Sequence, residues 1–282
     1  MFRADRLATL YVFRPLRQQM GSRRRPRIPI LMYHSVSEHQ SNGSHPYFKT
    51  ATSPQVFAEH MRFLSENGYR TLHLDDAVHC IGSGQKPHER SVVLTFDDGF
   101  QDFATHAFPV LARYGFTATV FLPTGYIANE RRRFNDRDCL TWQEVREMDL
   151  AGVTFGSHTV THPQLRSLKA DEEVERELRW SKATIEDELG HAVDSFSYPF
   201  AFPETDRYFT RNLRDLLEEQ GYRNGVSTII GTAGAGDDEF FLPRLPVNSW
   251  DDPPLFRAKL AGDYDWLHLV QYATKLAKFG VS

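Results

Sequence analysis

The chain has 282 residues, 40% of them hydrophobic and 25% charged, which is the composition of an ordinary globular protein. Its apolar stretches run to only a few residues, well short of the roughly 20 that a membrane-spanning helix needs. The two cysteines, Cys80 and Cys139, form no C-x-x-C pair, which argues against a disulfide framework or a thiolate zinc site. One disulfide between them stays open, although two ordinary core thiols fit better.

Residues 1–27 carry the basic charge of the chain, with eight arginines and one aspartate, so the remainder is acidic. The apolar run from Leu7 to Phe13 is followed by arginines and by no small-residue cleavage site, which argues against a secretory signal. We interpret this segment as a solvated extension, with a surface helix that touches anionic lipid as the alternative. The acidic remainder argues against nucleic-acid binding. We expect a cytoplasmic or membrane-peripheral protein rather than a secreted one.

From Ile28 onward, strand-like apolar runs alternate with helix-like segments, the clearest of which is a helix over 171–189. Glycines before four of the apolar runs are typical of helix C-termini. Alternating strands and helices predict a parallel sheet with ligands at the C-terminal strand ends. We therefore expect one catalytic domain over 28–282, with strands in the ranges 28–33, 91–96, 117–122, 153–157, 193–198 and 226–230.

Two polar motifs follow strands of this predicted sheet. Asp97 and Asp98 come directly after the strand over 91–96, and adjacent buried carboxylates repel each other unless a cation or a proton separates their roles. His158 and His162 follow the strand over 153–157 with a metal-ligand spacing. One carboxylate and two imidazoles make a three-ligand set with an open position for water, so the two motifs together predict a metal site.

These motifs, Thr95-Phe96-Asp97-Asp98-Gly99 and Ser157-His158-Thr159-Val160-Thr161-His162, resemble the first two motifs of the polysaccharide deacetylases with a NodB-homology domain, carbohydrate esterase family 4. The similarity spans roughly residues 28–250. It implies an α/β fold, a distorted (β/α) barrel in a single domain, with a divalent metal, most commonly zinc, at its mouth. By this resemblance Asp98, His158 and His162 are the metal ligands and Asp97 is the general base.

The third family motif, Arg-x-Pro-x-Gly, is altered here to Ser197-Tyr198-Pro199-Phe200-Ala201. The missing arginine would have held the base, and Arg244 is our candidate to supply its charge from another strand end, with a surface arginine beside two prolines as the alternative. Tyr198 is our candidate to donate its backbone N–H to the oxyanion, although its ring also fits a core position. Pro199 is placed with the substrate-binding residues.

The family's last motif, Leu-x-His near the C-terminus, supplies the general acid. Here Leu267-His268 lies in an amphipathic, helix-like stretch, whereas the early strand Ile28-Pro29-Ile30-Leu31-Met32-Tyr33 ends in His34. This order resembles the permuted poly-N-acetylglucosamine deacetylases, and the first and last strands of a closed barrel are neighbours. We predict His34 as the general acid, with a structural histidine as the alternative.

The fourth family motif, Asp-x-x-Asp-Trp, is poorly matched by Asp263-Tyr264-Asp265-Trp266 and by Asn248-Ser249-Trp250. We place Trp250 near the substrate and assign Asp263 and Asp265 to the surface. The resemblance implies a hydrolase that removes N-acetyl groups from an amino-sugar polymer, oligosaccharide or precursor. The alternatives are an amidase acting on a lipid-linked sugar or small amide, and a saccharide-binding relative without catalysis, which would have no need of a base beside a metal.

Overall fold

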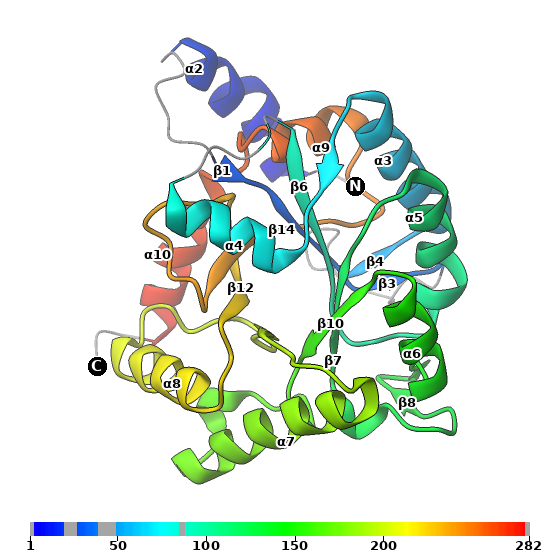
Figure 1. Ribbon diagram of the computed structural model, residues 1–282. Coiled ribbons are helices and arrows are strands. Elements are labelled where there is room, and N and C mark those ends of the chain that lie inside the picture. Colours follow the sequence, from blue (N-terminus) through cyan, green and yellow to red (C-terminus); the bar gives the residue numbers. More distant parts are fainter. Residues whose placement is uncertain (1–2, 20–26, 39–48, 85–87, 89, 280–282) are drawn as a thin grey trace.

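The computed structural model describes residues 3–19, 27–38, 49–84, 88 and 90–279. In this part of the chain, seven parallel strands close into a barrel, and a short strand, β5 (Arg70–Thr71), extends it beside β6. The predicted barrel is confirmed (Figure 1). The order around the ring is β2 (Ile30–Tyr33), β14 (Leu242–Pro246), β12 (Asn224–Ile230), β11 (Ser195–Ser197), β10 (Thr154–Ser157), β7 (Thr119–Leu122), β6 (Ser91–Phe96) and β2 again.

The barrel strands are apolar on both faces because helices cover the outside and side chains fill the inside. Every residue of β2, β6 and β7 is buried, as the continuous hydrophobic runs in the sequence predict. The helices that surround the barrel in Figure 1 are α3 (Pro54–Glu66), α4 (Leu74–Ser83), α5 (Phe108–Tyr114), α6 (Trp142–Leu150), α7 (Asp171–Leu189), α8 (Arg207–Glu219), α9 (Pro253–Leu260) and α10 (Leu267–Phe279).

Local signals set the helix ends. Ser53 caps α3 with proline at the first helical position, and Thr141 and Glu144 form a reciprocal capping box at the start of α6. The predicted helix over 171–189 is α7, and it ends at Gly190, whose φ of 76° is the left-handed conformation that glycine adopts without strain.

Short elements shape the mouth of the barrel, where the strands end. They are the parallel pair β3 (Ser35–Val36) and β4 (Ala51–Thr52), the antiparallel hairpin β8 (Arg133–Phe134) and β9 (Arg137–Asp138), and the single turns η3 (Phe103–Ala107), η4 (Thr124–Tyr126) and η5 (Leu165–Ser167). A further antiparallel pair joins β1 (Arg27–Ile28) to β13 (Ala233–Gly234). Over the described residues, no helix combines the length and the apolar character needed to cross a bilayer.

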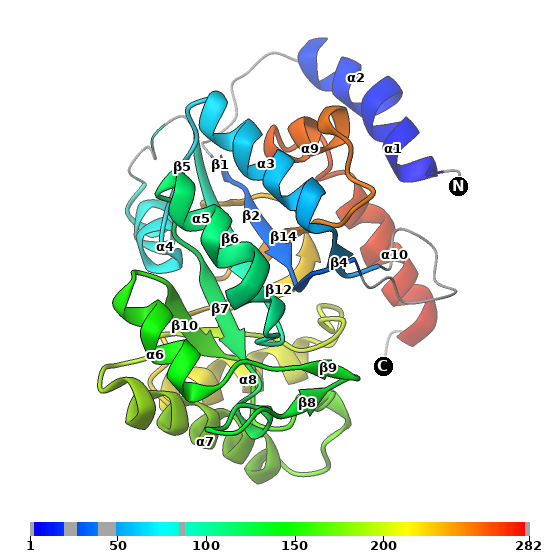
Figure 2. The ribbon, with the colours of Figure 1, turned by 90° about the vertical axis from the view of Figure 1, so that its right-hand side faces the viewer.

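The N-terminal segment packs on the barrel, so our interpretation of it as a solvated extension is wrong for residues 3–19. These residues form α1 (Ala4–Ala8), η1 (Thr9–Phe13) and α2 (Arg14–Gln19), which lie beside α9 in Figure 2. The ring of Phe13 stacks on that of Trp266 with centroids 4.3 Å apart, and Trp266 donates its indole N–H to Thr9. The sequence concealed this contact because its partners lie some 250 residues away.

Candidate active site

The two sequence motifs meet at the mouth of the barrel. Asp98 follows β6, and His158 and His162 follow β10, two strands away around the ring. One ligand atom from each of the three residues lies within 4.8 Å of the other two. The Oδ1 atom of Asp98 is 3.6 Å from Nε2 of His158 and 3.5 Å from Nε2 of His162. Two ligand atoms of a tetrahedral zinc ion are about 3.3 Å apart, so the spacing suits one ion between them.

The protonation states of the histidines also suit a metal. Burial lowers the pKa of His158 to about 4 and that of His162 to about 3, so both rings are neutral near pH 7. Nδ1 of His158 lies 2.8 Å from the backbone carbonyl of Ser197, which assigns the proton to Nδ1 and leaves Nε2 free to bind a cation. The donor set therefore fits a divalent metal.

The two neighbouring carboxylates, Asp97 and Asp98, have pKa values shifted in opposite directions. Burial and the neighbouring Asp97 raise the pKa of Asp98 to about 8, and a cation bound between Asp98 and the two imidazoles would lower it. Burial would also raise the pKa of Asp97, but the guanidinium of Arg244 holds it well below its ordinary range. Asp97 is thus an ionised carboxylate beside three side chains that are suited to bind a cation.

Arg244 lies where its predicted role requires. Its guanidinium is fully buried and donates to both carboxylate oxygens of Asp97 at 2.8 Å, the bidentate geometry that arginine favours. Its Nε donates to the carbonyl of Ser227 at 2.9 Å, and the hydroxyl of Ser197 donates to Asp97 at 3.2 Å. The charge missing from the third motif is therefore supplied by β14, and the surface-arginine alternative is wrong.

His34 converges with the metal ligands despite its early position in the chain. β2 pairs with both β14 and β6, and its end places Nε2 of His34 3.9 Å from Oδ2 of Asp97. Burial lowers the pKa of His34 to about 4, while the charge of Asp97 opposes this shift. His268 instead lies on α10, where its ring contacts Glu204 at 2.7 Å. Of the two histidines, His34 is the one placed to exchange a proton beside Asp97.

Tyr198 does not have the free donor that we predicted. Its backbone N–H donates to the carbonyl of Val226 at 3.0 Å, continuing the pairing of β11 with β12, and its ring is buried against Phe202. The oxyanion role of Tyr198 is therefore wrong. Pro199 is buried as well, whereas the next residue, Phe200, is 47% exposed and its ring lies 4.6 Å from that of His162. Phe200 is the residue of this loop that lies next to the three metal-ligand residues, which we call the metal cluster.

Backbone strain concentrates at this site. Asp98, Thr159, His162 and Phe200 all have positive φ, between 55° and 73°, which is uncommon outside glycine. Two of these residues are metal ligands, and the other two lie next to the ligands. The carboxylate of Glu177 on α7 holds the histidine loop by accepting from the backbone N–H groups of Val160 and Thr161 at 2.7 and 2.8 Å. Sequence reasoning missed Glu177, because nothing in its helix marks one acidic residue among many.

The weak fourth motif does not reach the metal ligands. Trp250 is 37% exposed and lines a cavity of about 330 Å³ with His60, Phe63 and Phe256, none of which touches the cluster, so its substrate role stays a prediction. Asp263 is buried and pairs with Arg17 at 3.0 Å, and Asp265 accepts from Thr232 at 2.7 Å. Our assignment to the surface is wrong for Asp263, whereas Asp265 is half-buried and lines a cavity, and both acids hold structural contacts.

Comparisons with known proteins agree with this geometry. Residues 84–225, half of the chain, match the family model for polysaccharide deacetylase. YxkH of Bacillus subtilis (strain 168), whose name places it among the polysaccharide deacetylases, is 32% identical over 222 residues, covering 79% of this chain and 72% of its own. The poly-beta-1,6-N-acetyl-D-glucosamine N-deacetylase of Staphylococcus aureus (strain MRSA252) is 22% identical over 234 residues, covering 77% and 78%.

Solved structures share the fold. The Streptococcus pyogenes deacetylase PplD, solved in complex with acetate, has a TM-score of 0.72 at 24% identity, over 84% of this chain and 99% of its own. IcaB from Ammonifex degensii has a TM-score of 0.69 at 22% identity, over 85% and 97%. The family model and the Bacillus relative show that the chain belongs to the polysaccharide deacetylase family, whose members are hydrolases of carbon–nitrogen bonds.

Proposed function

We propose that this protein removes N-acetyl groups from an amino-sugar polymer, releasing acetate and leaving free amines. The observation that carries the proposal is the ionised carboxylate of Asp97, which is held by Arg244 and lies beside a carboxylate and two neutral imidazoles within 4.8 Å of one another. The name of the Staphylococcus aureus relative, a poly-N-acetylglucosamine deacetylase, supports this substrate class.

Asp98, His158 and His162 would hold the metal, for which we propose zinc because two imidazoles and one carboxylate suit it. A bound divalent ion would lower the pKa of water and polarise the acetamide carbonyl. Asp97 takes the proton from the attacking water, since Arg244 keeps it ionised and in a fixed orientation. The ring of His34 lies 3.9 Å from Asp97 and is neutral at rest. It takes up the proton that Asp97 removed from the water and passes that proton to the leaving amine.

The test is acetate release from N-acetylglucosamine oligomers, read by mass spectrometry together with the metal content of each variant. His158→Ala removes a ligand and is expected to lose both metal and turnover. Asn has nearly the same shape as Asp, and Asp97 is not one of the three metal ligands. The Asp97→Asn variant should therefore keep its metal and lose roughly 10²–10⁴-fold in kcat. Full metal occupancy in His158→Ala, or normal turnover in Asp97→Asn, would contradict the assignment.

A lipid-linked sugar is a second candidate substrate, and one feature favours it. Tyr11, Val12 and Leu16 on the docked N-terminal segment are 71%, 49% and 50% exposed, and three exposed apolar side chains on one short helical segment suit contact with a membrane surface. Sedimentation with vesicles that contain phosphatidylserine tests this contact. We expect the triple variant Tyr11→Ser, Val12→Ser, Leu16→Ser to bind at least severalfold less than the native chain, and equal binding would contradict membrane contact.

A further inference from the structure

A second cavity lies away from the metal cluster, between α8, α10 and the strands β12 and β14. It has a volume of about 570 Å³, and none of its lining residues belongs to the catalytic or metal-binding set. β12 is joined to β14 by β13 and a loop, without a helix, and α8 and α10 flank this side of the barrel in Figure 1. Small-molecule sites are typically about 300–1,000 Å³, so the cavity is large enough for an organic ligand.

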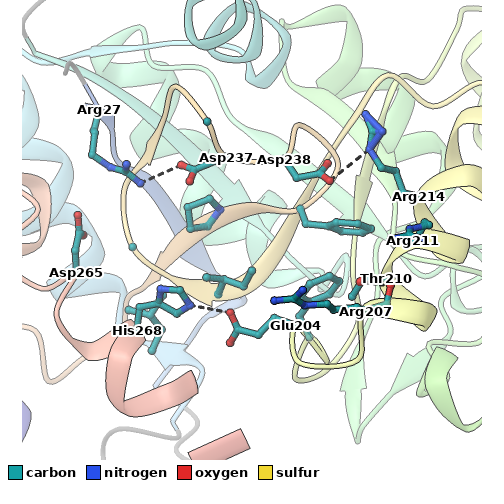
Figure 3. A pocket seen from close by; sticks show the side chains of 17 residues that line it. Arg27, Glu204, Arg207, Thr210, Arg211, Arg214, Asp237, Asp238, Asp265 and His268 are labelled. Carbon is teal, nitrogen blue, oxygen red and sulfur yellow. Dashed lines mark hydrogen bonds and ion pairs between the residues drawn. The ribbon is translucent and has the colours of Figure 1, made fainter. Parts of the chain in front are cut away.

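Two acidic groups on the cavity wall are already neutralised by arginines. Asp237 pairs with Arg27 at 3.0 Å and accepts from the backbone N–H of Gly234 at 2.7 Å. Asp238 lies 3.4 Å from Arg214, as the dashed line in Figure 3 marks. These carboxylates are therefore not free to bind a cationic ligand.

The remaining acids of the wall are engaged as well. Glu204 contacts His268 and Lys275, each at 2.7 Å, and both partners hold its pKa below the ordinary value against the effect of burial. Asp265 accepts from the backbone N–H and the hydroxyl of Thr232 at 3.0 and 2.7 Å. All four carboxylates that line the cavity therefore already have hydrogen-bond or ion-pair partners.

Arg207 and Arg211 remain as the unneutralised charges of the cavity. They are exposed and lie four residues apart on α8, so they share one face of the helix, along the α8 side of the cavity in Figure 3. Within the described ranges, neither guanidinium has an ion pair or a hydrogen bond. Two free guanidinium groups on the rim of one cavity select for an oxyanion, because arginine binds carboxylate and phosphate in bidentate geometry.

The size and the lining of the cavity indicate what the anion is attached to. Phe202, Ile229 and Phe241 line the cavity, but the rings of Phe202 and Phe241 are only 2% and 6% exposed, so they offer a ligand little surface, whereas Ile229 is half-buried. A volume of about 570 Å³ is far larger than an inorganic ion needs, which favours an anion carried on a small organic group.

We propose that this cavity binds a small organic phosphate or carboxylate, such as a sugar phosphate or a sugar acid, with Arg207 and Arg211 donating to the oxyanion and Ile229 bordering the organic group. The site lies apart from the metal cluster and acts independently of the deacetylation proposed above. Phosphate and carboxylate present the same chemistry to arginine, and the choice of probe separates them.

The test is isothermal titration of the full chain with glucose 1-phosphate, with glucuronate and with neutral glucose. We expect binding of at least one anionic sugar, and at least tenfold weaker binding of glucose, which corresponds to about 1.4 kcal/mol. The double variant Arg207→Gln, Arg211→Gln should weaken anion binding at least tenfold while deacetylation of a neutral oligomer stays unchanged. Arg179→Gln, the same charge change on exposed α7, is the matched control and should bind normally.

A second control addresses the metal-ligand residues Asp98, His158 and His162, because a phosphate or carboxylate could also bind a metal ion held there. Asp98→Asn should bind the anionic sugar like the native chain, since the cavity shares no residue with the cluster. Binding lost in Asp98→Asn, binding retained in the double variant, equal affinity for glucose, or no binding of either anionic sugar at millimolar concentration would each overturn the proposal. Failure of this cavity to bind leaves the deacetylase assignment standing, because its readout is acetate release.

Discussion

Two buried arginine–carboxylate pairs in this molecule do different work. At the mouth of the barrel, Arg244 holds Asp97, and the two side chains are 0% and 3% exposed. At the N-terminal contact, Arg3 holds Asp251 at 3.0 Å, and these side chains are 5% and 0% exposed. Both pairs join segments far apart in the chain, and both are desolvated, so removing one partner leaves the other as a buried charge and lowers the free energy of unfolding.

The difference lies in what else surrounds the carboxylate. Asp251 also binds the ammonium of Lys259 at 2.7 Å and the backbone N–H of Asn248 at 3.2 Å, so its capacity as an acceptor is taken up by structural contacts. Asp97 keeps a side directed toward His34 and the metal ligands. The same electrostatic device therefore fixes a tertiary contact in one region and prepares a reactive group in the other.

The largest expected effect comes from His34, which distinguishes the reactive region from the structural one. If His34 delivers the proton to the leaving amine, His34→Ala should lower kcat by roughly 10²–10⁴-fold and keep its metal, because the ring is not one of the three ligands. His268→Ala is the matched control and should stay within about twofold. Steady-state kinetics with metal analysis decides this, and near-normal turnover in His34→Ala would exclude the permuted arrangement.

A comparable loss, in stability rather than turnover, is expected at the N-terminal pair. Arg3→Ala leaves Asp251 and Asp5 buried beside a missing charge, which typically costs about 3–5 kcal/mol of unfolding free energy. Urea unfolding measures the loss, and kcat per folded molecule should change little at low temperature. A change in unfolding free energy below about 1 kcal/mol would show that the N-terminal segment contributes no stability through this pair.

These two regions also mark how far the sequence could be read. The strand ends carrying Asp97, Asp98, His158 and His162 were predictable because strand and ligand lie next to each other in the chain, and parallel strands bring such ends to one edge. Arg244 and His34 were predictable because the altered third motif lacks its arginine and the last motif lacks a histidine at a strand end, so that a replacement charge and a replacement acid had to come from other strands. The N-terminal contact was not, since the carboxylate that Arg3 needs lies 248 residues away.

The predictions that were wrong at and near the site failed for a similar reason. Tyr198 was placed by its position in a motif, but whether a backbone N–H is free depends on where β11 stops pairing with β12, which sequence does not specify. Asp263 and Asp265 look like surface acids because their partners, Arg17 and Thr232, belong to segments that meet them only in the folded chain. Charge that is satisfied at long range is invisible in local patterns.

A smaller effect is expected from Arg244→Lys, which keeps the positive charge but loses the bidentate geometry. Asp97 must be ionised to act as a base, and Arg244 lowers its pKa, so activity persists at acidic pH until Asp97 is protonated. A weaker partner raises that pKa, and the acidic limb of the pH–kcat profile should move to higher pH by roughly one unit. Metal content measured at each pH separates this shift from metal release, and an unmoved limb would mean that Arg244 does not tune the base.

The smallest effect is expected at an exposed pair beside Arg3. Arg6 contacts Asp252 at 2.5 Å, yet the two side chains are 28% and 39% exposed, so water solvates both charges when the pair is broken. Arg6→Ala should therefore cost only about 0.2–1 kcal/mol of unfolding free energy, with turnover unchanged. Measured in the same urea series as Arg3→Ala, this variant separates burial from contact distance as the source of stability, because Arg3 and Arg6 each have a 2.5 Å contact with an aspartate and differ in exposure. Equal losses in the two variants would mean that the N-terminal segment is held by its total charge and not by the buried pair.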